Sequence, residues 1–550
     1  MGVPEATENA ENDTISYIDP PLSYHSVDEE KQISAITDPT EIPQDEANPD
    51  DTVWKPGVRE WLVLVCVSTL AMMDSFCATT VVSLIPGLSK SFSKPIAATL
   101  WCATGYLLAN AASQAFFFLL SEVFGHGPLL LIAVVVSTIG TGICGGSSNL
   151  PTLIAGRFIQ GIGGGGATSI SLLIVADMIP PPYRGRFSGY VFMNQVAGAM
   201  LGPFLGGIFI DYVEYSWAFY FNLVFCALGM LMIPFAIDLR GQKGDYFYKL
   251  RVVDWIGAFL TMLGIGCLLV GLSFGGTLCK WDDWQTLTPL VIGGASIIAL
   301  IVYENIWAVQ PLFSSTVFRS YSAVMAYIGS FLHGLLMFCQ LQYLIIYLAS
   351  IKLLALTSAG VSLMAITGFS LLTTIFSNRY ANTPRSSPWT IRAGWILNIL
   401  ATALLIVLYS QTPTAGWIFI FITAGMGHGL LISGYNTYMQ AFPQRQDGED
   451  EHRVSASAMI MYSFLRTWGM CIAIPVGGAM LLNQMNGNIV SISNDDVDNG
   501  HAKRRLITSE GITNMHFIRL VGFQIVWQVF TGVAALGGIT SCFVHVKREK

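Results

Sequence analysis

The sequence predicts an all-α polytopic membrane protein with fourteen transmembrane helices. Of its 550 residues, 53% are hydrophobic and 11% are charged, whereas roughly a quarter of the residues are charged in ordinary globular domains. Apolar segments of about 20 residues, the length that crosses a bilayer, recur along nearly the whole chain. We therefore interpret the chain as one polytopic unit embedded in a lipid bilayer, and not as several soluble domains.

Hydropathy divides the fourteen predicted spans into three groups. The first six spans cover residues 60–83, 97–120, 128–147, 150–175, 187–210 and 218–238. Two more cover 253–275 and 287–308, and the last six cover 323–349, 355–377, 391–410, 414–440, 456–482 and 517–544. We expect a six-helix bundle at 58–238, two inserted helices at 253–308 and a second six-helix bundle at 309–545.

The distribution of basic residues predicts the orientation. An even number of spans places both termini on one side, and most of the 28 Lys and Arg residues lie in cytosolic segments if that side is the cytosol, as the positive-inside rule requires. This topology makes 239–252 a cytosolic linker, 484–516 an outer loop and 546–550 a cytosolic tail. The expected location is the plasma membrane, with the vacuolar membrane as the alternative.

The N-terminal segment differs in composition from the rest of the chain. The first fifty residues contain thirteen Asp or Glu residues and a single basic residue, Lys31, with no apolar period. Such a segment cannot bury enough apolar surface to fold by itself. Residues 1–57 are therefore expected to be a disordered acidic cytosolic tail.

Signatures of catalysis and metal binding are missing from the sequence. The eight histidines are scattered, and no His-x-x-x-His, Cys-x-x-Cys or Gly-x-Ser-x-Gly pattern occurs. The glycine tract at 161–166 is not followed by Gly-Lys-Ser/Thr, so it indicates helix packing and not a phosphate loop. We expect no enzyme activity, no metal, no cofactor and no nucleic-acid partner.

A ladder of glycines interrupted by a proline is the most informative motif. Residues 197–207 read Ala-Gly-Ala-Met-Leu-Gly-Pro-Phe-Leu-Gly-Gly, and a partial copy with Pro475 followed by two glycines occurs in the thirteenth span. Helices interrupted by Gly and Pro at matching places in two halves point to the moving elements of a transporter. The residues assigned to hinge and packing roles are Gly198, Gly202, Pro203, Gly206, Gly207 and Pro475.

Three charged residues within predicted spans are candidates for function, because burying a charge in a bilayer is costly. Arg157 lies in the middle of the fourth span and is expected to serve proton coupling. Asp74 lies in the first span, where structural pairing competes equally with proton carriage. Arg466 lies in the thirteenth span, where its side chain could instead extend toward the cytosolic edge.

From about residue 60 to 545 the chain resembles the major facilitator superfamily, specifically its fourteen-span drug:proton antiporter branch, which includes fungal-type multidrug and secondary-metabolite efflux pumps. Gly198–Gly207 matches the Gly-x-x-x-Gly-Pro-x-x-Gly-Gly signature of this branch. Residues 156–163 resemble the fourth-span signature, in which a membrane-embedded Arg is implicated in proton coupling. Arg466 begins an Arg-x-x-Gly that resembles the one in span thirteen. The resemblance implies a secondary active transporter with the major facilitator fold.

The chain departs from this family at two places. Between the second and third spans, His126 and Gly127 stand where the family usually has two basic residues. In the first span the aligned acidic position is Cys77, with Asp74 about one turn earlier. The residues that the resemblance assigns to the cytosolic gate loops are Glu122, Gly125, Asp177 and Arg184.

The expected function is proton-coupled efflux of a small amphipathic organic compound, such as a drug, toxin or secondary metabolite, by alternating access in a monomer. Proton-linked uptake of an organic solute is the alternative within transport, and a non-transporting membrane sensor is a different class. Polar residues within spans could bind the substrate, although they also commonly join helices. The candidates for the substrate cavity are Gln160, Asn194, Gln195, Gln340 and Arg466.

Overall fold

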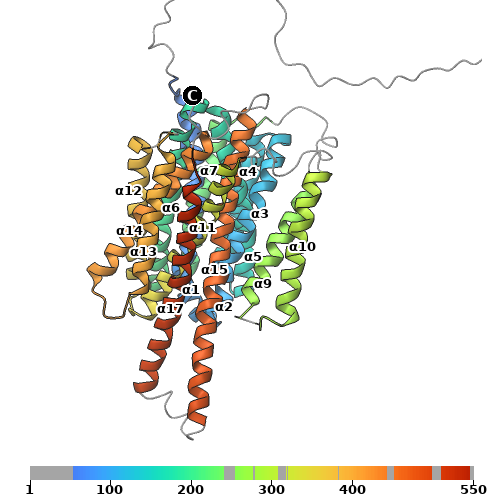
Figure 1. The fold of residues 1–550 in the computed structure, drawn as a ribbon. Helices are drawn as coiled ribbons and strands as arrows, with labels where there is room; N and C mark the ends of the chain where they lie inside the picture. The colour runs from blue at the N-terminus through green and yellow to red at the C-terminus, as the bar shows by residue number, and fades with distance from the viewer. Residues whose placement is uncertain are drawn as a thin grey trace, which may run out of the picture. The chain divides into compact units, whose positions relative to one another are not determined.

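The computed structural model describes residues 54–240, 254–276, 279–307, 318, 320–381, 383, 385–441, 451–497 and 509–545. Fourteen helices in this part of the chain are long and apolar enough to cross a membrane, which confirms the predicted all-α architecture (Figure 1). The acidic tail at 1–57, the linker at 239–252 and the tail at 546–550 lie mostly or entirely outside the described residues.

The first six spans form the N-terminal bundle. Its helices are α1 (Val58–Ser91), α3 (Trp101–Phe124) with the short α2 (Ile96–Thr99) before it, α4 (His126–Gly145), α5 (Leu150–Met178), α6 (Pro181–Tyr212) and α7 (Tyr215–Ala236). Helix α6 packs along α1, and α5 packs against both α3 and α4. The glycine tract of α5 permits this contact, because a Cβ atom on Gly163 would lie 2.3 Å from the backbone nitrogen of Ser137.

The last six spans form the C-terminal bundle. Its helices are α11 (Tyr321–Ser350), α12 (Leu356–Phe376) continued by the π-helix η2 (Ser377–Ala381), α13 (Ser387–Ile406), α14 (Thr414–Ala441), α15 (Glu451–Val497) and α17 (Ser509–Cys542). The packing pairs of the first bundle recur here in the same order: α11 packs along α15 as α1 packs along α6, and α14 contacts α12 and α13 as α5 contacts α3 and α4. The two bundles are therefore structural repeats.

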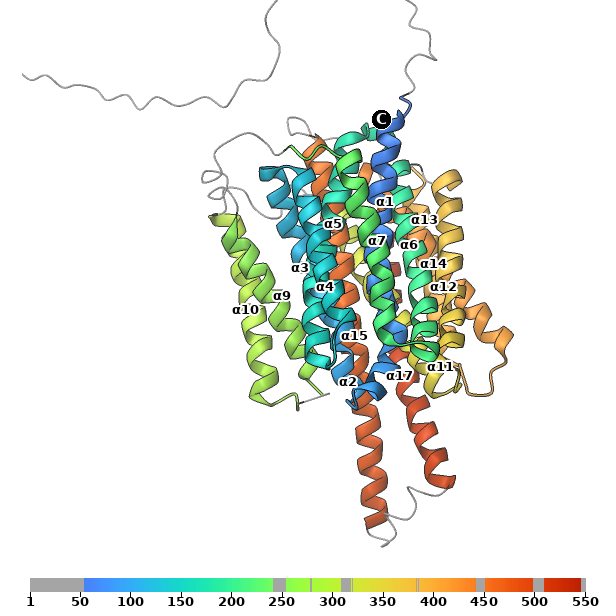
Figure 2. The same ribbon diagram turned by 180° about the vertical axis from the view of Figure 1, so that it is seen from behind.

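The two inserted helices lie at the edge of the bundles. Helices α9 (Trp255–Phe274) and α10 (Trp284–Ile306) pack on each other, and α9 contacts α3 of one bundle and α15 of the other. Figures 1 and 2 show the pair at one edge of the helices from both sides. Large apolar side chains of α10, such as Val291 and Ile298, are exposed, as expected of a helix that faces lipid.

Two pairs of helices form most of the contact between the bundles. Helix α6 packs against α12, and α3 packs against α15. The glycine ladder of α6 also packs closely on α1 of its own bundle, because Cβ atoms on Gly198 and Gly206 would lie 2.4 Å and 2.6 Å from the carbonyl oxygens of Met72 and Thr80. Gly207 faces the other bundle, where its Cβ would lie 2.6 Å from the carbonyl oxygen of Leu356.

The segment expected to be an outer loop, 484–516, is largely helical. Helix α15 continues to Val497 and α17 begins at Ser509, so both helices extend beyond the ends of their neighbours (Figure 2). The difference has a physical reason. Residues 484–497 are too polar to give a membrane-span signal, but a helix outside the bilayer does not need apolar residues, because water can solvate its polar side chains.

Candidate functional site

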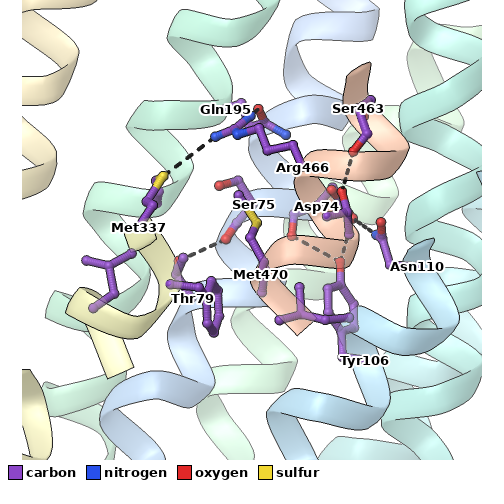
Figure 3. A pocket seen from close by; sticks show the side chains of 16 residues that line it. Asp74, Ser75, Thr79, Tyr106, Asn110, Gln195, Met337, Ser463, Arg466 and Met470 are labelled. Carbon is purple, nitrogen blue, oxygen red and sulfur yellow. Dashed lines mark hydrogen bonds between the residues drawn. The ribbon is translucent and has the colours of Figure 1, made fainter. Parts of the chain in front are cut away.

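A cavity of about 40 Å³ lies between the two bundles, walled by α1, α3 and α6 on one side and by α11 and α15 on the other (Figure 3). On the same measure a single water molecule needs about 10–15 Å³, so the cavity has room for only a few waters. A drug-sized compound needs a larger cavity than this one. The lining residues are Asp74, Ser75, Ala78, Thr79, Tyr106, Leu107, Asn110, Gln195, Ala199, Met337, Phe338, Leu341, Ser463, Arg466, Thr467 and Met470.

Asp74 of α1 is the acidic residue in this lining, and its side chain is 6% exposed. Its Oδ1 accepts hydrogen bonds from the hydroxyl of Tyr106 at 2.5 Å and from Nδ2 of Asn110 at 2.7 Å. Its Oδ2 accepts from the hydroxyl of Thr168 at 3.0 Å. All three donors are uncharged, so the carboxyl group is held in place without an ion pair.

Arg157 of α5 lies behind this group in the interior of the N-terminal bundle and has no exposed surface. Its Nε donates to the carbonyl oxygen of Cys102 at 2.8 Å, and Nη1 donates to Oε1 of Gln160 at 2.6 Å. The guanidinium carbon lies 4.1 Å from the centroid of the Tyr106 ring. Tyr106 therefore contacts both predicted proton-coupling residues, its ring with Arg157 and its hydroxyl with Asp74.

Gln160 belongs to this interior network and does not line the cavity. Its Nε2 donates to the hydroxyl of Thr141 at 2.8 Å and contacts Sγ of Cys77 at 3.2 Å. Asn222 of α7 donates to the same sulfur at 2.8 Å. Cys77 thus points into the bundle, whereas Asp74, three residues earlier, borders the cavity.

The other predicted substrate residues separate into two groups. Gln195 and Arg466 line the cavity and join the bundles, because Nη1 of Arg466 donates to Oε1 of Gln195 at 3.0 Å. Asn194 instead donates to the carbonyl oxygen of Tyr190 within α6. Gln340 is buried in the C-terminal bundle. Gln160, Asn194 and Gln340 therefore do not line this cavity, and their role in substrate binding stays a prediction.

These three amides contact other groups instead. Asn194 bonds within α6, whereas its neighbour Gln195 lines the cavity. Gln340 bonds within its own bundle, with its Nε2 2.9 Å from the hydroxyl of Thr402 and its Oε1 2.9 Å from Nε2 of His428. Gln160 and Gln340 thus join helices within their bundles, which is the second role that polar residues commonly have in membranes.

Sequence analysis missed Tyr106, Asn110 and Thr168, the three donors to Asp74. A signal for two of them was present, since Tyr106, Asn110 and Gln114 recur every four residues in an apolar span and so share one face of α3. Thr168 had no such signal in the sequence, because a threonine in a membrane helix commonly bonds to its own backbone.

Hydrogen bonds join the bundles at both ends of α6. The hydroxyl of Ser188 in α6 donates to Oδ1 of Asn436 in α14 at 2.8 Å, and Nδ2 of Asn436 donates to the carbonyl oxygen of Gly185 at 3.0 Å. At the opposite end, Oδ2 of Asp211 in α6 accepts from the backbone N–H and the hydroxyl of Thr357 at 2.8 Å and 2.9 Å. Both ends of α6 are thus bound to the other bundle.

The residues predicted to form the cytosolic gate loops lie where α3 ends, where α4 begins, where α5 ends and where α6 begins. Glu122 is in the last turn of α3, and Gly125 joins α3 to α4 with φ of 98°, a value that favours glycine. Asp177 pairs with His126 through Oδ2 and Nε2 at 3.0 Å. The side chain of Arg184 is buried, with Nε 2.8 Å from the carbonyl oxygen of Ile179.

Two structurally repeated six-helix bundles around a polar cavity define a membrane transporter of the alternating-access type. The chain belongs to the Major Facilitator Superfamily, because the model of that family matches residues 64–474. The predicted family and fold are therefore confirmed. Two solved structures share this fold. The human organic anion transporter MFSD10 (TETRAN) has a TM-score of 0.57 and 14% sequence identity, and the match covers 88% of this chain and all of the other. A bacterial homolog of the human lysosomal transporter Spinster has a TM-score of 0.55 and 15% sequence identity, and the match covers 89% of this chain and 98% of the other.

Curated relatives are fungal transporters. The chain is 29% identical to MFS transporter L2 of a Phoma species over 446 residues, covering 81% of this chain and 73% of the relative. It is 27% identical to efflux pump FUS6 of Gibberella fujikuroi over 515 residues, covering 91% of each. It is 25% identical to MFS efflux transporter aclA of Aspergillus oryzae over 499 residues, covering 88% of each. These relatives confirm the predicted resemblance to the fungal efflux branch.

Proposed function

We propose that this protein exports a small amphipathic organic compound in exchange for protons. The relatives named as efflux pumps support export, and the position of Asp74 supports proton coupling. A buried carboxyl group that borders the cavity between the bundles can exchange a proton with whichever side the cavity faces. The proposed partners are the exported compound, protons and the lipid bilayer, and the protein needs no catalytic residue and no cofactor.

The hydrogen bonds of Asp74 suit a group that gains and loses a proton. Its three donors are neutral, so protonation breaks no ion pair. Arg157 lies on the far side of the Tyr106 ring, and its positive charge attracts the ionised carboxylate in a medium where charges are weakly screened. Protonation of Asp74 removes a negative charge from the cavity wall, which weakens binding of any compound that donates a hydrogen bond to it. Proton and compound thus exclude each other.

Helix α6 is the proposed moving element. It contacts its own bundle through the glycine ladder and the other bundle at both ends. Pro203 lacks the N–H that would bond to the helix four residues earlier, which permits bending there. Pro475 likewise lies inside α15, the helix that corresponds to α6 in the other bundle. Opening of one end of the interface while the other stays closed would give alternating access.

The proposed setting is a monomer in the plasma membrane with both termini in the cytosol. The even number of spans among the described residues supports termini on one side, and the distribution of Lys and Arg supports the cytosol as that side. Export from this membrane removes the compound from the cell.

Proteoliposomes with an imposed pH gradient test this function. Two probes of opposite charge, cationic rhodamine 6G and anionic 3-(4-hydroxyphenyl)propanoate, would be followed inside the vesicles. We expect the wild type to move at least one probe against its gradient, and Asp74→Asn and Arg157→Ala to abolish this movement. Asp282→Asn and Arg392→Ala change residues away from the cavity and serve as matched controls. Gradient-driven transport that persists in Asp74→Asn contradicts the assigned proton site, and movement of a probe down the proton gradient together with protons indicates uptake.

A further inference from the structure

Arg466 is the basic residue of the cavity lining and comes from the C-terminal bundle (Figure 3). Its side chain is 5% exposed. Besides the bond to Gln195, Nη2 contacts Sδ of Met337 at 3.7 Å, and Nε has no hydrogen-bond partner in the described part of the chain. No carboxylate among the described residues pairs with this guanidinium.

A buried guanidinium with only neutral partners is costly. The group has five N–H donors and always carries its charge, and a charge without a counter-ion is strongly disfavoured in an apolar interior. Extension toward the membrane surface does not relieve the cost here. Arg466 lies twelve residues after Val454, the start of the apolar span, which is about 18 Å along a helix.

Asp74 does not supply the missing charge. The two residues face the same cavity from different bundles without forming an ion pair, and the carboxyl group of Asp74 already accepts three hydrogen bonds. The cavity therefore offers an acceptor on one wall and an unsatisfied cationic donor on the other. Met337, Phe338 and Met470 contribute apolar surface to the same lining, and methionine adapts well to ligands of different shape.

We propose that the exported compound carries an anionic oxygen group, such as a carboxylate, that binds Arg466, and a hydroxyl or amino donor that binds Asp74. This assignment of a substrate class rests on the proposed export function. The anionic group replaces Gln195 as the partner of Nη1 and supplies the absent counter-charge. Because the bond between Arg466 and Gln195 joins the bundles, its replacement also loosens the closed interface.

The two ends of such a compound have different tasks. The donor end competes with the proton for Asp74 and couples binding to the proton gradient. The anionic end selects the class of compound, because a charge-assisted bond to a guanidinium is about twice as strong as a neutral one. A compound that lacks the anionic group leaves Arg466 without a counter-charge when it fills the cavity.

Binding to purified protein in lipid nanodiscs tests the proposal without a proton gradient. The probes are 3-(4-hydroxyphenyl)propanoate, its methyl ester, which lacks the charge, and 3-phenylpropanoate, which lacks the donor. Affinity would be measured by isothermal titration calorimetry. We expect the wild type to bind the hydroxy acid about tenfold or more tightly than the ester.

Variants locate this preference. Arg466→Gln should reduce the preference for acid over ester to near unity, and Asp74→Asn should reduce the preference for the hydroxy acid over 3-phenylpropanoate while keeping the preference for the acid over the ester. Arg392→Gln, which removes an arginine that bonds to the end of α17, should change neither ratio. Thermal unfolding of each variant shows whether it is folded.

Three results overturn the proposal. The first is equally tight binding of the ester and the acid by the wild type. The second is no binding of any probe by the wild type up to the solubility limits. The third is a preference for acid over ester that is unchanged in Arg466→Gln. If Arg466 only pairs with Asp74 in another conformation, its loss weakens acid and ester equally. Wild-type protein that shows the binding preference but no gradient-driven transport counts against proton coupling alone, so the two proposals fail separately.

Discussion

The ring of Tyr106 separates the guanidinium group of Arg157 from the carboxyl group of Asp74. The guanidinium carbon is 4.1 Å from the ring centroid, and the tyrosine hydroxyl is 2.5 Å from Oδ1 of Asp74. The two charged residues therefore interact across an aromatic ring and not as a direct ion pair. This arrangement leaves the carboxyl group open to the cavity while its positive neighbour stays inside the bundle.

Replacement of Tyr106 by phenylalanine separates the two contacts. The ring under Arg157 is kept, whereas the donor to Asp74 is lost, at a cost of about 1–3 kcal/mol if the carboxylate remains ionised. We expect gradient-driven transport to fall about tenfold and its pH profile to shift, with folding retained. The measurement is probe transport in proteoliposomes at several pH values. A pH profile identical to that of the wild type would show that the hydroxyl does not act on Asp74.

Moving the carboxyl group from position 74 to position 77 tests where the proton site lies. Cys77 occupies the position aligned with the family's acid but contacts Gln160 and Asn222 inside the bundle. We therefore expect Cys77→Asp to leave the transport defect of Asp74→Asn unrepaired, because a carboxylate at 77 does not border the cavity. Cys77→Ser, which retains size and polarity, is the control. Restored proton-driven transport in the double variant would place the site inside the bundle.

The glycine ladder gives a prediction about stability. A Cβ atom on Gly202 would lie 2.1 Å from Oγ1 of Thr79 and 2.8 Å from the backbone nitrogen of Thr80. Gly202→Ala should therefore force α6 away from α1 and destabilise the bundle by about 1–3 kcal/mol, the usual cost of overpacking. Gly532→Ala in α17 is the matched control, since its Cβ would meet no atom within 4 Å. Thermal unfolding in detergent compares the two, and equal melting temperatures would contradict close packing at Gly202.

Cross-linking tests the closure of the cytosolic end. Ser188 and Asn436 hydrogen-bond across the bundles at 2.8 Å, so cysteines at both positions should form a disulfide on oxidation. We expect the oxidised double variant to lose transport and to regain it with a reductant, because the cytosolic end must open in each cycle. Each single cysteine variant should respond no more than the wild type. Full transport after complete cross-linking would exclude opening at this end.

The sequence by itself determined the number of spans, their division into two bundles and an inserted pair, and the family. These features follow from the bilayer, which requires about 20 apolar residues for each crossing and makes a buried charge such as Arg157 conspicuous. The motif from Gly198 to Gly207 identified the tightly packed helix, because only small residues allow such contact. Proton coupling by Arg157 and Asp74 remains a prediction from the sequence that the structure makes specific.

The tertiary structure alone decided which polar residues share the cavity. It placed Gln195 and Arg466 there, turned Gln160 and Gln340 into the bundle interiors, and put Tyr106 next to Asp74. Composition cannot give this result, because a few polar residues in an apolar helix do not show whether their face meets the cavity or the interior of the bundle. That rotation is set by packing against neighbouring helices, and a difference of one residue turns a side chain by about 100°.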